Sequence, residues 1–398
     1  MREVTIERLG REGDGIAGDL RLPYALPGER WAIGDGEPRL LAAAPERVAP
    51  PCPHFGTCGG CALQHAADGW IAGWKAGTIA RALAARGLAA EIRPTLTSPP
   101  RSRRRAVFSA RRTRKGATVG FHGRRSETLV EVSHCLVVTP AIAAALPGLA
   151  RLARVAASRT ATIRLTVTDG SAGLDVDVAG ARELDPELRA ALAAVAGAED
   201  LARLASNGEL LAVRRPPFQV MGAARVVPPP GAFLQATAEG ERALVAAVRE
   251  AVGGARRVAD LFAGSGTFAL PLAEAAEVLA VEGDPAMPAA LAEAARRTPG
   301  LRAVRAAARD LFRRPLLAAE LAPFDAVVID PPRAGAEAQC RELARSRVPL
   351  VAAVSCDPAT FARDAAILTA GGYRLDWMQP VDQFRWSGHV ELAARFSR

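Results

Sequence analysis

The chain has 398 residues, of which 49% are hydrophobic, so it can bury a large core and is not a mostly disordered protein. Basic residues outnumber acidic ones by 51 to 42, and the resulting net charge of +9 indicates a polyanionic partner. No uncharged apolar run reaches about 18 residues and the first residues carry no signal-peptide pattern, so we expect a cytoplasmic protein without a membrane span.

Residues 1–50 form the first predicted unit, a small β-rich segment. Its short strand candidates are separated by Gly and Pro, as at Gly13-Asp-Gly15, which is typical of a small barrel. Pro50-Pro51-Cys52-Pro53 ends this segment. Because the pattern changes again after Pro228-Pro-Pro-Gly231, the sequence predicts three domains. They cover residues 1–50, 51–230 and 231–398.

Cysteines crowd together at the start of the second unit, where three of them lie between residues 52 and 61. In a cytosolic chain, thiols are more often metal ligands or nucleophiles than disulfide partners. Four thiolates can hold either an iron–sulfur cluster or zinc, and the neighbouring His54 and His65 keep zinc open as the alternative. The candidate metal ligands are Cys52, Cys58, Cys61 and Cys135.

The rest of the second unit predicts helices over 70–88, 141–157 and 183–205, with strands between them. Between residues 101 and 125 the chain carries many arginines and no acidic residue. Such a basic stripe is typical of nucleic-acid binding, and the alternative is a solvated arginine face. The candidate RNA-binding residues are Arg103, Arg104, Arg105, Arg111, Arg112, Arg124 and Arg125.

After about residue 234, helices alternate with short continuous apolar runs that predict strands. The strand candidates end near residues 261, 282, 330 and 355. Buried strands separated by helices are typical of a doubly wound, mostly parallel sheet, so the sequence predicts an α/β fold for this unit.

The first of these strands ends in Asp260-Leu-Phe-Ala-Gly264-Ser-Gly266. Glycines at this place let the backbone turn tightly and approach a ligand, and Glu282, at the end of the next strand, is placed to bind ribose hydroxyls. The acid before the glycines favours the cationic S-adenosylmethionine, whereas Gly264-x-Gly266-x-x-Ala269 also satisfies a loose NAD pattern. The candidate cofactor residues are Gln235, Asp260, Gly264, Gly266, Glu282, Asp310 and Asp330.

Three residues near later strand ends are candidates for catalysis. Asp330 begins a rigid Asp-Pro-Pro-Arg turn. Cys356, at the carboxyl end of a strand, is placed for nucleophilic attack, and the alternative is a small buried hydrophobe. Glu391 lies in an apolar stretch, where burial raises the pKa of a carboxyl toward that of a useful base, and the alternative is a solvent-facing Glu on an edge strand. Cys340, on a predicted helix, has no such setting and is expected to be structural.

A cysteine, a carboxylate and a methyl donor fit one reaction on uracil. A thiolate that adds to carbon 6 makes carbon 5 nucleophilic toward a methylsulfonium, and a base then removes the carbon 5 proton so that the thiolate leaves. The target nucleotide must be splayed out of its stack, with arginines on the flanking phosphates.

The motifs Asp330-Pro-Pro-Arg, Val354-Ser-Cys-Asp-Pro-Ala-Thr-Phe-Ala-Arg-Asp and His389-Val-Glu resemble those of the RNA uracil-C5 methyltransferases. The resemblance covers nearly the whole chain. It implies a Rossmann-like class I methyltransferase domain, a central α+β domain that carries the cysteines, and a shortened TRAM barrel over residues 1–50.

The same resemblance implies a role for each candidate residue. Cys356 is expected to be the nucleophile, Glu391 the base, and Asp330 a hydrogen-bond partner of the uracil edge. Gln235 is expected to contact cofactor or base, while Glu282 and Asp310 hold the adenosine. The chain departs from the family at Thr237, where Asn is usual, and over residues 382–389, which lack the usual Met-Phe-Pro and the Thr before His.

The cysteine spacing resembles the [4Fe–4S] ligation of the ribosomal RNA branch of the family. We therefore expect a structural [4Fe–4S] cluster, with zinc as the alternative, and 23S rRNA as the substrate. The alternatives are the same chemistry on tRNA, an RNA-binding iron–sulfur protein without activity and, more distantly, an NAD-dependent oxidoreductase. No feature of the sequence indicates an obligate protein partner.

Overall fold

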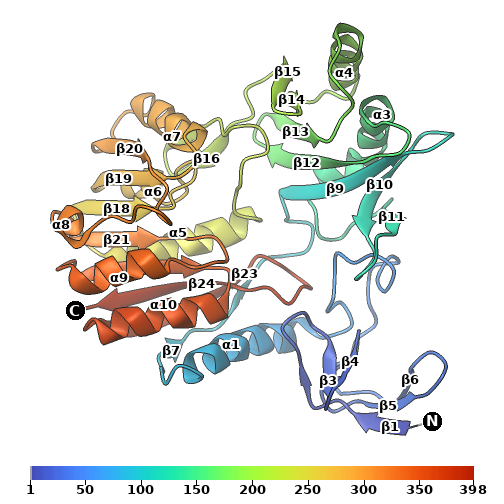
Figure 1. The fold of residues 1–398 in the computed structure, drawn as a ribbon, viewed down its shortest axis with the longest axis horizontal. Helices are drawn as coiled ribbons and strands as arrows, with labels where there is room; N and C mark the ends of the chain where they lie inside the picture. The colour runs from blue at the N-terminus through green and yellow to red at the C-terminus, as the bar shows by residue number, and fades with distance from the viewer. Residues whose placement is uncertain (1) are drawn as a thin grey trace.

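The structure is a computed structural model that describes residues 2–398. A large sheet covered by helices forms one side of the molecule, and the central sheet and the N-terminal sheets form the other (Figure 1). Within residues 2–398, no helix is both long and apolar enough to cross a bilayer.

The N-terminal unit contains two small antiparallel sheets of three strands each. Strands β1 (Arg2–Thr5), β5 (Arg30–Ile33) and β6 (Arg39–Ala42) form one sheet, and β2 (Arg8–Leu9), β3 (Gly15–Ala17) and β4 (Leu20–Leu22) form the other. Ile6, Leu22 and Ala25 fill the small core of this unit. The β-rich character of this segment is confirmed, while its closure into a TRAM-like barrel stays a prediction.

The central unit is built on a sheet of seven strands in the order β11-β10-β9-β12-β13-β14-β15. The strands are β9 (Arg105–Arg112), β10 (Ala117–His122), β11 (Leu129–Glu131), β12 (Thr162–Gly170), β13 (Gly173–Ala179), β14 (Arg203–Ser206) and β15 (Glu209–Val213). The helices are α2 (Pro140–Ala144), α3 (Leu146–Ala156) and α4 (Pro186–Ala198). A separate hairpin pairs β16 (Gln219–Met221) with β17 (Ala224–Val226).

Two helix predictions in this unit need correction. The single helix expected over 141–157 is divided into α2 and α3, because Pro147 has no N–H to continue the hydrogen bonding of the first helix. The helix expected over 183–205 ends at Ala198 instead. Asp200 has a φ of 51°, in the left-handed region, and the chain turns there into the fully buried strand β14.

The C-terminal unit forms a sheet of nine strands in the order β20-β19-β18-β21-β22-β24-β23-β7, with β8 also paired to β23. The strands are β7 (Glu91–Ile92), β8 (Leu96–Thr97), β18 (Arg257–Leu261), β19 (Glu277–Glu282), β20 (Val304–Ala308), β21 (Ala326–Ile329), β22 (Leu350–Ser355), β23 (Arg374–Asp382) and β24 (Glu391–Ser397). Strands β18 to β22 are parallel, whereas β24 runs antiparallel between β22 and β23.

Helices cover both faces of this sheet, so the predicted doubly wound arrangement is confirmed. Helices α5 (Ala238–Val252), α6 (Ala269–Leu272) and α7 (Ala286–Arg296) pack on one face. Helices α1 (Asp68–Ala84), α8 (Ala318–Leu321), α9 (Glu337–Arg345) and α10 (Pro358–Ala370) pack on the other. Each face of the sheet has its own hydrophobic core. Successive residues of a strand point alternately into one core and the other, as Val258 and Ala259 do.

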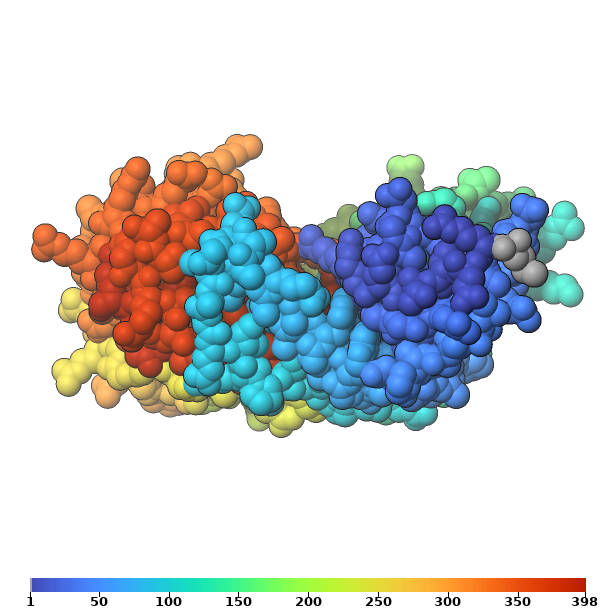
Figure 2. Space-filling view, turned by 90° about the horizontal axis from the view of Figure 1, so that it is seen from below, coloured from blue at the N-terminus to red at the C-terminus, as the bar shows by residue number. Residues whose placement is uncertain are grey.

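The segment from α1 to β8 belongs by packing to the large sheet, although it precedes the central sheet in sequence. Ile79 and Leu83 of α1 are buried in the same core as α10, and β7 and β8 pair with β23. In Figure 2 this light-blue segment lies between the red C-terminal residues and the dark-blue N-terminal unit. The predicted domain boundaries stay a prediction. This segment lies within the predicted second unit, residues 51–230, although its strands belong to the large sheet of the third.

Candidate active site

The strand order of the large sheet reverses between β18 and β21, and ligands of doubly wound sheets bind at such a place, beyond the carboxyl ends of the strands. Asp260 lies near the end of β18, Asp330 directly follows β21, and Cys356 directly follows β22. Glu391 begins β24, which runs in the opposite direction beside β22. The fold therefore brings these four sequence candidates to one edge of the sheet.

Cys356 is half-buried and lines a cavity of about 280 Å³. Ser355 pairs with Leu392 in the β22–β24 ladder, which puts the cysteine next to Glu391. Burial and the negative charges of Glu391 and Asp330 raise the pKa of the Cys356 thiol to about 11. The thiol is thus protonated at neutral pH in the free protein, and it must lose this proton before it can attack.

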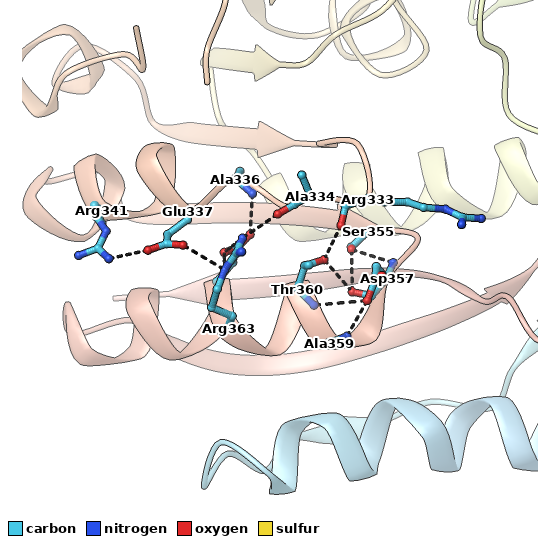
Figure 3. A network of polar contacts seen from close by, with 11 residues as sticks. Arg333, Ala334, Ala336, Glu337, Arg341, Ser355, Asp357, Ala359, Thr360 and Arg363 are labelled. Carbon is cyan, nitrogen blue, oxygen red and sulfur yellow. Dashed lines mark hydrogen bonds and ion pairs between the residues drawn. The ribbon is translucent and has the colours of Figure 1, made fainter. Parts of the chain in front are cut away.

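The turn that carries Cys356 is tied to the turn that carries Asp330 (Figure 3). Asp357 caps α10, since its Oδ1 accepts hydrogen bonds from the Ala359 N–H at 2.9 Å and the Thr360 N–H at 3.4 Å. The Thr360 hydroxyl donates to the Arg333 carbonyl at 3.1 Å. Arg11, from the N-terminal unit, forms an ion pair with Asp357 that the sequence did not indicate.

Glu391 is only 4% exposed, and its strand β24 lies inside the sheet, so the solvent-facing edge strand considered above is wrong. Burial raises the pKa of the Glu391 carboxyl well above its ordinary range, and the negative charge of Asp330 adds to this rise. Gln383 donates a hydrogen bond from Nε2 to Glu391 Oε2 at 3.1 Å. This carboxylate has the setting expected of a base that works near neutral pH.

Asp330 is also held by a glutamine. The Gln235 Nε2 donates to Asp330 Oδ2 at 3.3 Å, and Gln235 itself is 1% exposed. Burial raises the pKa of Asp330, and the charge of Glu282 raises it further. Asp330 can therefore donate or accept a hydrogen bond, according to its protonation.

The loop over residues 382–389 contributes a residue that the sequence analysis did not single out. Gln383 lies between the predicted base and Gln235, and it contacts both. The available signal was the departure of this loop from the family pattern, but the sequence does not tell which of its side chains turns inward. His389, from the same loop, contacts Arg333, with 3.3 Å between the histidine Nε2 and the arginine Nη2.

The glycine loop after β18 has the conformation expected of a ligand-binding turn. Gly264 and Gly266 have φ values of 55° and 106°, in the region that favours glycine. A Cβ on Gly266 would lie 2.8 Å from a Leu270 methyl, whereas the space beside Gly264 is open. Glu282 accepts a hydrogen bond from the Gly264 N–H at 2.9 Å and so joins this loop to the end of β19.

Asp260 is fully buried, and within the described residues its carboxylate oxygens have no hydrogen-bond partner of normal geometry, although the Ala269 N–H lies close enough to lower the pKa of this carboxyl. Burial and the charges of Asp330 and Glu282 raise its pKa well above the ordinary range. Buried acids of this kind fit a ligand with a positive charge, such as the methionine end of S-adenosylmethionine. Asp310 lies two residues after the end of β20, the strand beside β19, and accepts hydrogen bonds from the N–H groups of Phe312 and Arg313.

The four cysteines predicted to bind metal, Cys52, Cys58, Cys61 and Cys135, line a single cavity of about 720 Å³. All of them are free thiols. Burial raises the pKa of Cys58, and that of Cys61 to about 12. Thiols are suitable iron–sulfur or zinc ligands, yet residues 2–398 contain no group of three or more His, Cys, Asp or Glu side chains arranged to hold a metal ion.

Several predicted RNA-binding arginines have partners within the protein. Arg104 pairs with Glu241 and donates from Nε to the Gln235 carbonyl at 3.1 Å, and Arg105 donates to the Ala232 carbonyl at 2.9 Å. These two residues therefore anchor the segment that carries Gln235. Four of the arginines line the cysteine cavity, namely Arg103, Arg105, Arg124 and Arg125. The last two also pair with Asp14 of the N-terminal unit.

This fold and this edge of the sheet define a class I S-adenosylmethionine-dependent methyltransferase. The structure resembles that of the Pyrococcus abyssi tRNA (uracil-54, C5)-methyltransferase solved in complex with S-adenosyl-L-homocysteine, with a TM-score of 0.75 over 99% of both chains and 22% identity. At that identity the likeness establishes the fold alone.

The sequence comparisons reach further. The family profile described as tRNA (Uracil-5-)-methyltransferase matches residues 228–398. An uncharacterized RNA methyltransferase of Rhizobium meliloti (strain 1021) is 46% identical, over 99% of each chain. The 23S rRNA (uracil(1939)-C(5))-methyltransferase RlmD of Chromohalobacter salexigens is 37% identical, over 99% of this chain and 89% of its own. This protein belongs to the RNA uracil-C5 methyltransferase family and is an S-adenosylmethionine-dependent enzyme.

Proposed function

We propose that this enzyme methylates carbon 5 of one uridine in 23S rRNA, with Cys356 as the nucleophile and Glu391 as the base. The observation that carries the proposal is the β22–β24 register, in which Ser355 faces Leu392 and the thiol therefore lies beside a buried carboxylate. A cysteine next to a carboxyl with a raised pKa is what addition to carbon 6 and removal of the carbon 5 proton require.

The proposed steps assign one proton or one bond to each side chain. The Cys356 thiol first gives its proton to water in the cavity that it lines. The thiolate then adds to carbon 6 of uracil, and the electron pair of the C5–C6 double bond moves onto carbon 5 and the O4 carbonyl. S-adenosylmethionine supplies the electrophilic methyl group that carbon 5 takes. The Glu391 carboxylate then removes the proton from carbon 5, the double bond re-forms, and the Cys356 thiolate leaves. Asp330 hydrogen-bonds the edge of the uracil ring and keeps carbon 6 near the sulfur.

The residues proposed to hold the methyl donor lie around the glycine loop. Asp260 faces its positive charge, Glu282 and Asp310 hold the ribose and adenine side, and the open space beside Gly264 lets the ligand approach the backbone. Gly266 allows the close packing on Leu270 that this turn needs. Gln235 is hydrogen-bonded to Asp330, and we place it between the residues that hold the methyl donor and those that contact the uracil ring.

RNA is proposed to enter along the arginine-lined cavity. This cavity and the smaller one that reaches Cys356 share Gly388 and His389 in their walls, so the basic surface continues to the nucleophile. Arginines there would hold the phosphates on either side of the target, and the uridine itself must leave its stack to present carbon 6.

A gene deletion tests the target. We expect deletion to remove one 5-methyluridine from 23S rRNA, as read by nucleotide-resolution mapping of total RNA, and we expect the wild-type gene to restore it. The choice of 23S rRNA is supported by the likeness to RlmD, whereas the family description favours tRNA. Loss of 5-methyluridine from tRNA, with 23S rRNA unchanged, would overturn the choice of substrate while leaving the chemistry intact.

We further propose that Cys52, Cys58, Cys61 and Cys135 hold a structural [4Fe–4S] cluster. The support is that all four thiols line one cavity, and that thiolates are suitable ligands for iron–sulfur clusters. Protein purified without oxygen is expected to be brown and to contain iron and acid-labile sulfide. Cys58→Ser is expected to lose both, whereas Cys340→Ala keeps them. A colourless protein that contains zinc would contradict the cluster.

A further inference from the structure

Gln383 makes three hydrogen bonds at the centre of the site. Its side-chain oxygen accepts from the Ala236 N–H at 2.7 Å, and its Nε2 donates to Gln235 Oε1 at 2.5 Å and to Glu391 Oε2 at 3.1 Å. The residue is 2% exposed. The two amide hydrogens and the amide oxygen are therefore all engaged with neighbours in the site.

The orientation of this amide follows from its partners. A backbone N–H can only donate, so the Gln383 oxygen must face Ala236, and the amide nitrogen must then face the carboxylate of Glu391. Gln235 continues the chain of amides, because its own nitrogen donates to Asp330. One unbroken set of hydrogen bonds thus joins the proposed base to the aspartate of the Asp-Pro-Pro-Arg turn.

The backbone on either side of Gln383 is fixed from two other parts of the chain. Asp382 is 1% exposed and forms an ion pair at 2.5 Å with the fully buried Lys75 of α1. Further along the loop that carries Gln383, the Trp386 carbonyl accepts hydrogen bonds from the N–H groups of Ala62 and Leu63, which directly follow Cys61. Gln383 therefore has little freedom to move away from the site.

We propose that Gln383 is a positioning residue that holds the Glu391 carboxylate in place for removal of the carbon 5 proton. The proposal rests on the proposed role of Glu391 as the base. A donated hydrogen bond favours the charged form of a carboxylate, so Gln383 also opposes the rise in pKa that burial and Asp330 impose on Glu391. Two further charged or titratable groups face this carboxyl, Arg333 and Cys356, and the Arg333 charge lowers the pKa of Glu391.

Gln383→Met tests the proposal, because methionine has a similar length but donates no hydrogen bond. Gln379→Met is the matched control. Gln379 lies four residues earlier, in β23, and is 9% exposed, but its amide donates to the Pro94 carbonyl at 2.8 Å and to the Pro380 carbonyl, away from the site. Single-turnover reactions are followed by the release of methylated RNA and by the covalent RNA–protein adduct on denaturing gels.

For Gln383→Met we expect product release to be about 10-fold slower, because a hydrogen bond to a charged group is lost. The adduct should accumulate. The pH dependence of release should move to higher pH by about one pH unit, because removing the donor raises the pKa of Glu391 and the ionised base then forms only at higher pH. Gln379→Met should match the wild type. Gln383→Glu, which puts a second carboxylate against Glu391, should shift the profile further in the same direction.

Glu391→Gln is run in parallel, so that the inference can fail separately from the proposed function. If Glu391→Gln traps the adduct while Gln383→Met and Gln383→Glu release product with the wild-type rate and pH profile, Gln383 has no positioning role. Slower product release by Gln383→Met, with an unshifted pH profile and no adduct, would also overturn the positioning role of Gln383. If Glu391→Gln traps nothing, the base assignment fails, and the inference fails with it. Unchanged S-adenosyl-L-homocysteine binding by each variant checks that the site is folded.

Discussion

Cys356→Ala is expected to abolish methyl transfer to RNA, with a loss of about 10⁴-fold or more, because covalent addition to carbon 6 is the step that makes carbon 5 nucleophilic. The assay follows transfer of a labelled methyl group into RNA. Binding of RNA and of S-adenosyl-L-homocysteine should stay close to wild type, because the Cys356 side chain lines the cavity and the turn around it is held by Asp357 and Thr360.

Cys340→Ala is the control for this experiment. Cys340 is fully buried on α9, in the core between that helix and the sheet, and plays no part in the proposed chemistry. It should lower stability by the loss of a buried sulfur and leave the specific activity of the folded protein unchanged. Turnover by Cys356→Ala at a rate near that of the wild type would remove the covalent mechanism.

Glu391→Gln is expected to trap a covalent adduct between the protein and methylated RNA that survives denaturing electrophoresis. Glutamine keeps the size of the side chain and can still accept the hydrogen bond from Gln383, but it cannot take the carbon 5 proton. The thiolate then cannot leave. Multiple turnover should fall by roughly 10²–10⁴-fold, the usual contribution of a positioned base, while addition and methylation proceed.

The double variant Cys356→Ala with Glu391→Gln is the control, since it should form no adduct. Mass spectrometry of the trapped species should place the RNA on Cys356 and find the methyl group already on the base. If Glu391→Gln turns over without any adduct, another group removes the proton and Glu391 is not the base.

Much of the fold was predictable because its signals are local. Short apolar runs such as Ala326 to Ile329 are buried on both faces of a sheet, and they identify parallel strands between helices before any contact is known. The carboxyl ends of such strands meet at one edge, so Asp260, Asp330 and Cys356 could be expected to lie together. The structure places them there.

The rest depends on contacts between distant parts of the chain. Gln383 and Gln235 are 148 residues apart, and Arg11 and Asp357 are 346 apart, so no local pattern joins them. The burial of Lys75 follows from its pairing with Asp382, which only the packing of α1 on β23 brings about. The sequence assigns strand β14 to the end of a helix because Leu204 and Ala205 suit both structures, and the pairing of β14 with β13 decides between them.

The buried carboxyl of Asp260 has a consequence for the binding of a charged ligand. Burial and the charges of Asp330 and Glu282 raise the pKa of Asp260, so a ligand that brings a positive charge to this end of the cleft would favour the ionised form of this acid. Methyl transfer removes the positive charge from the sulfur of the donor and leaves the charge of its ammonium group. On the proposed placement of the donor, these acids would therefore attract the spent molecule less strongly than the fresh one, which would favour the exchange of the two.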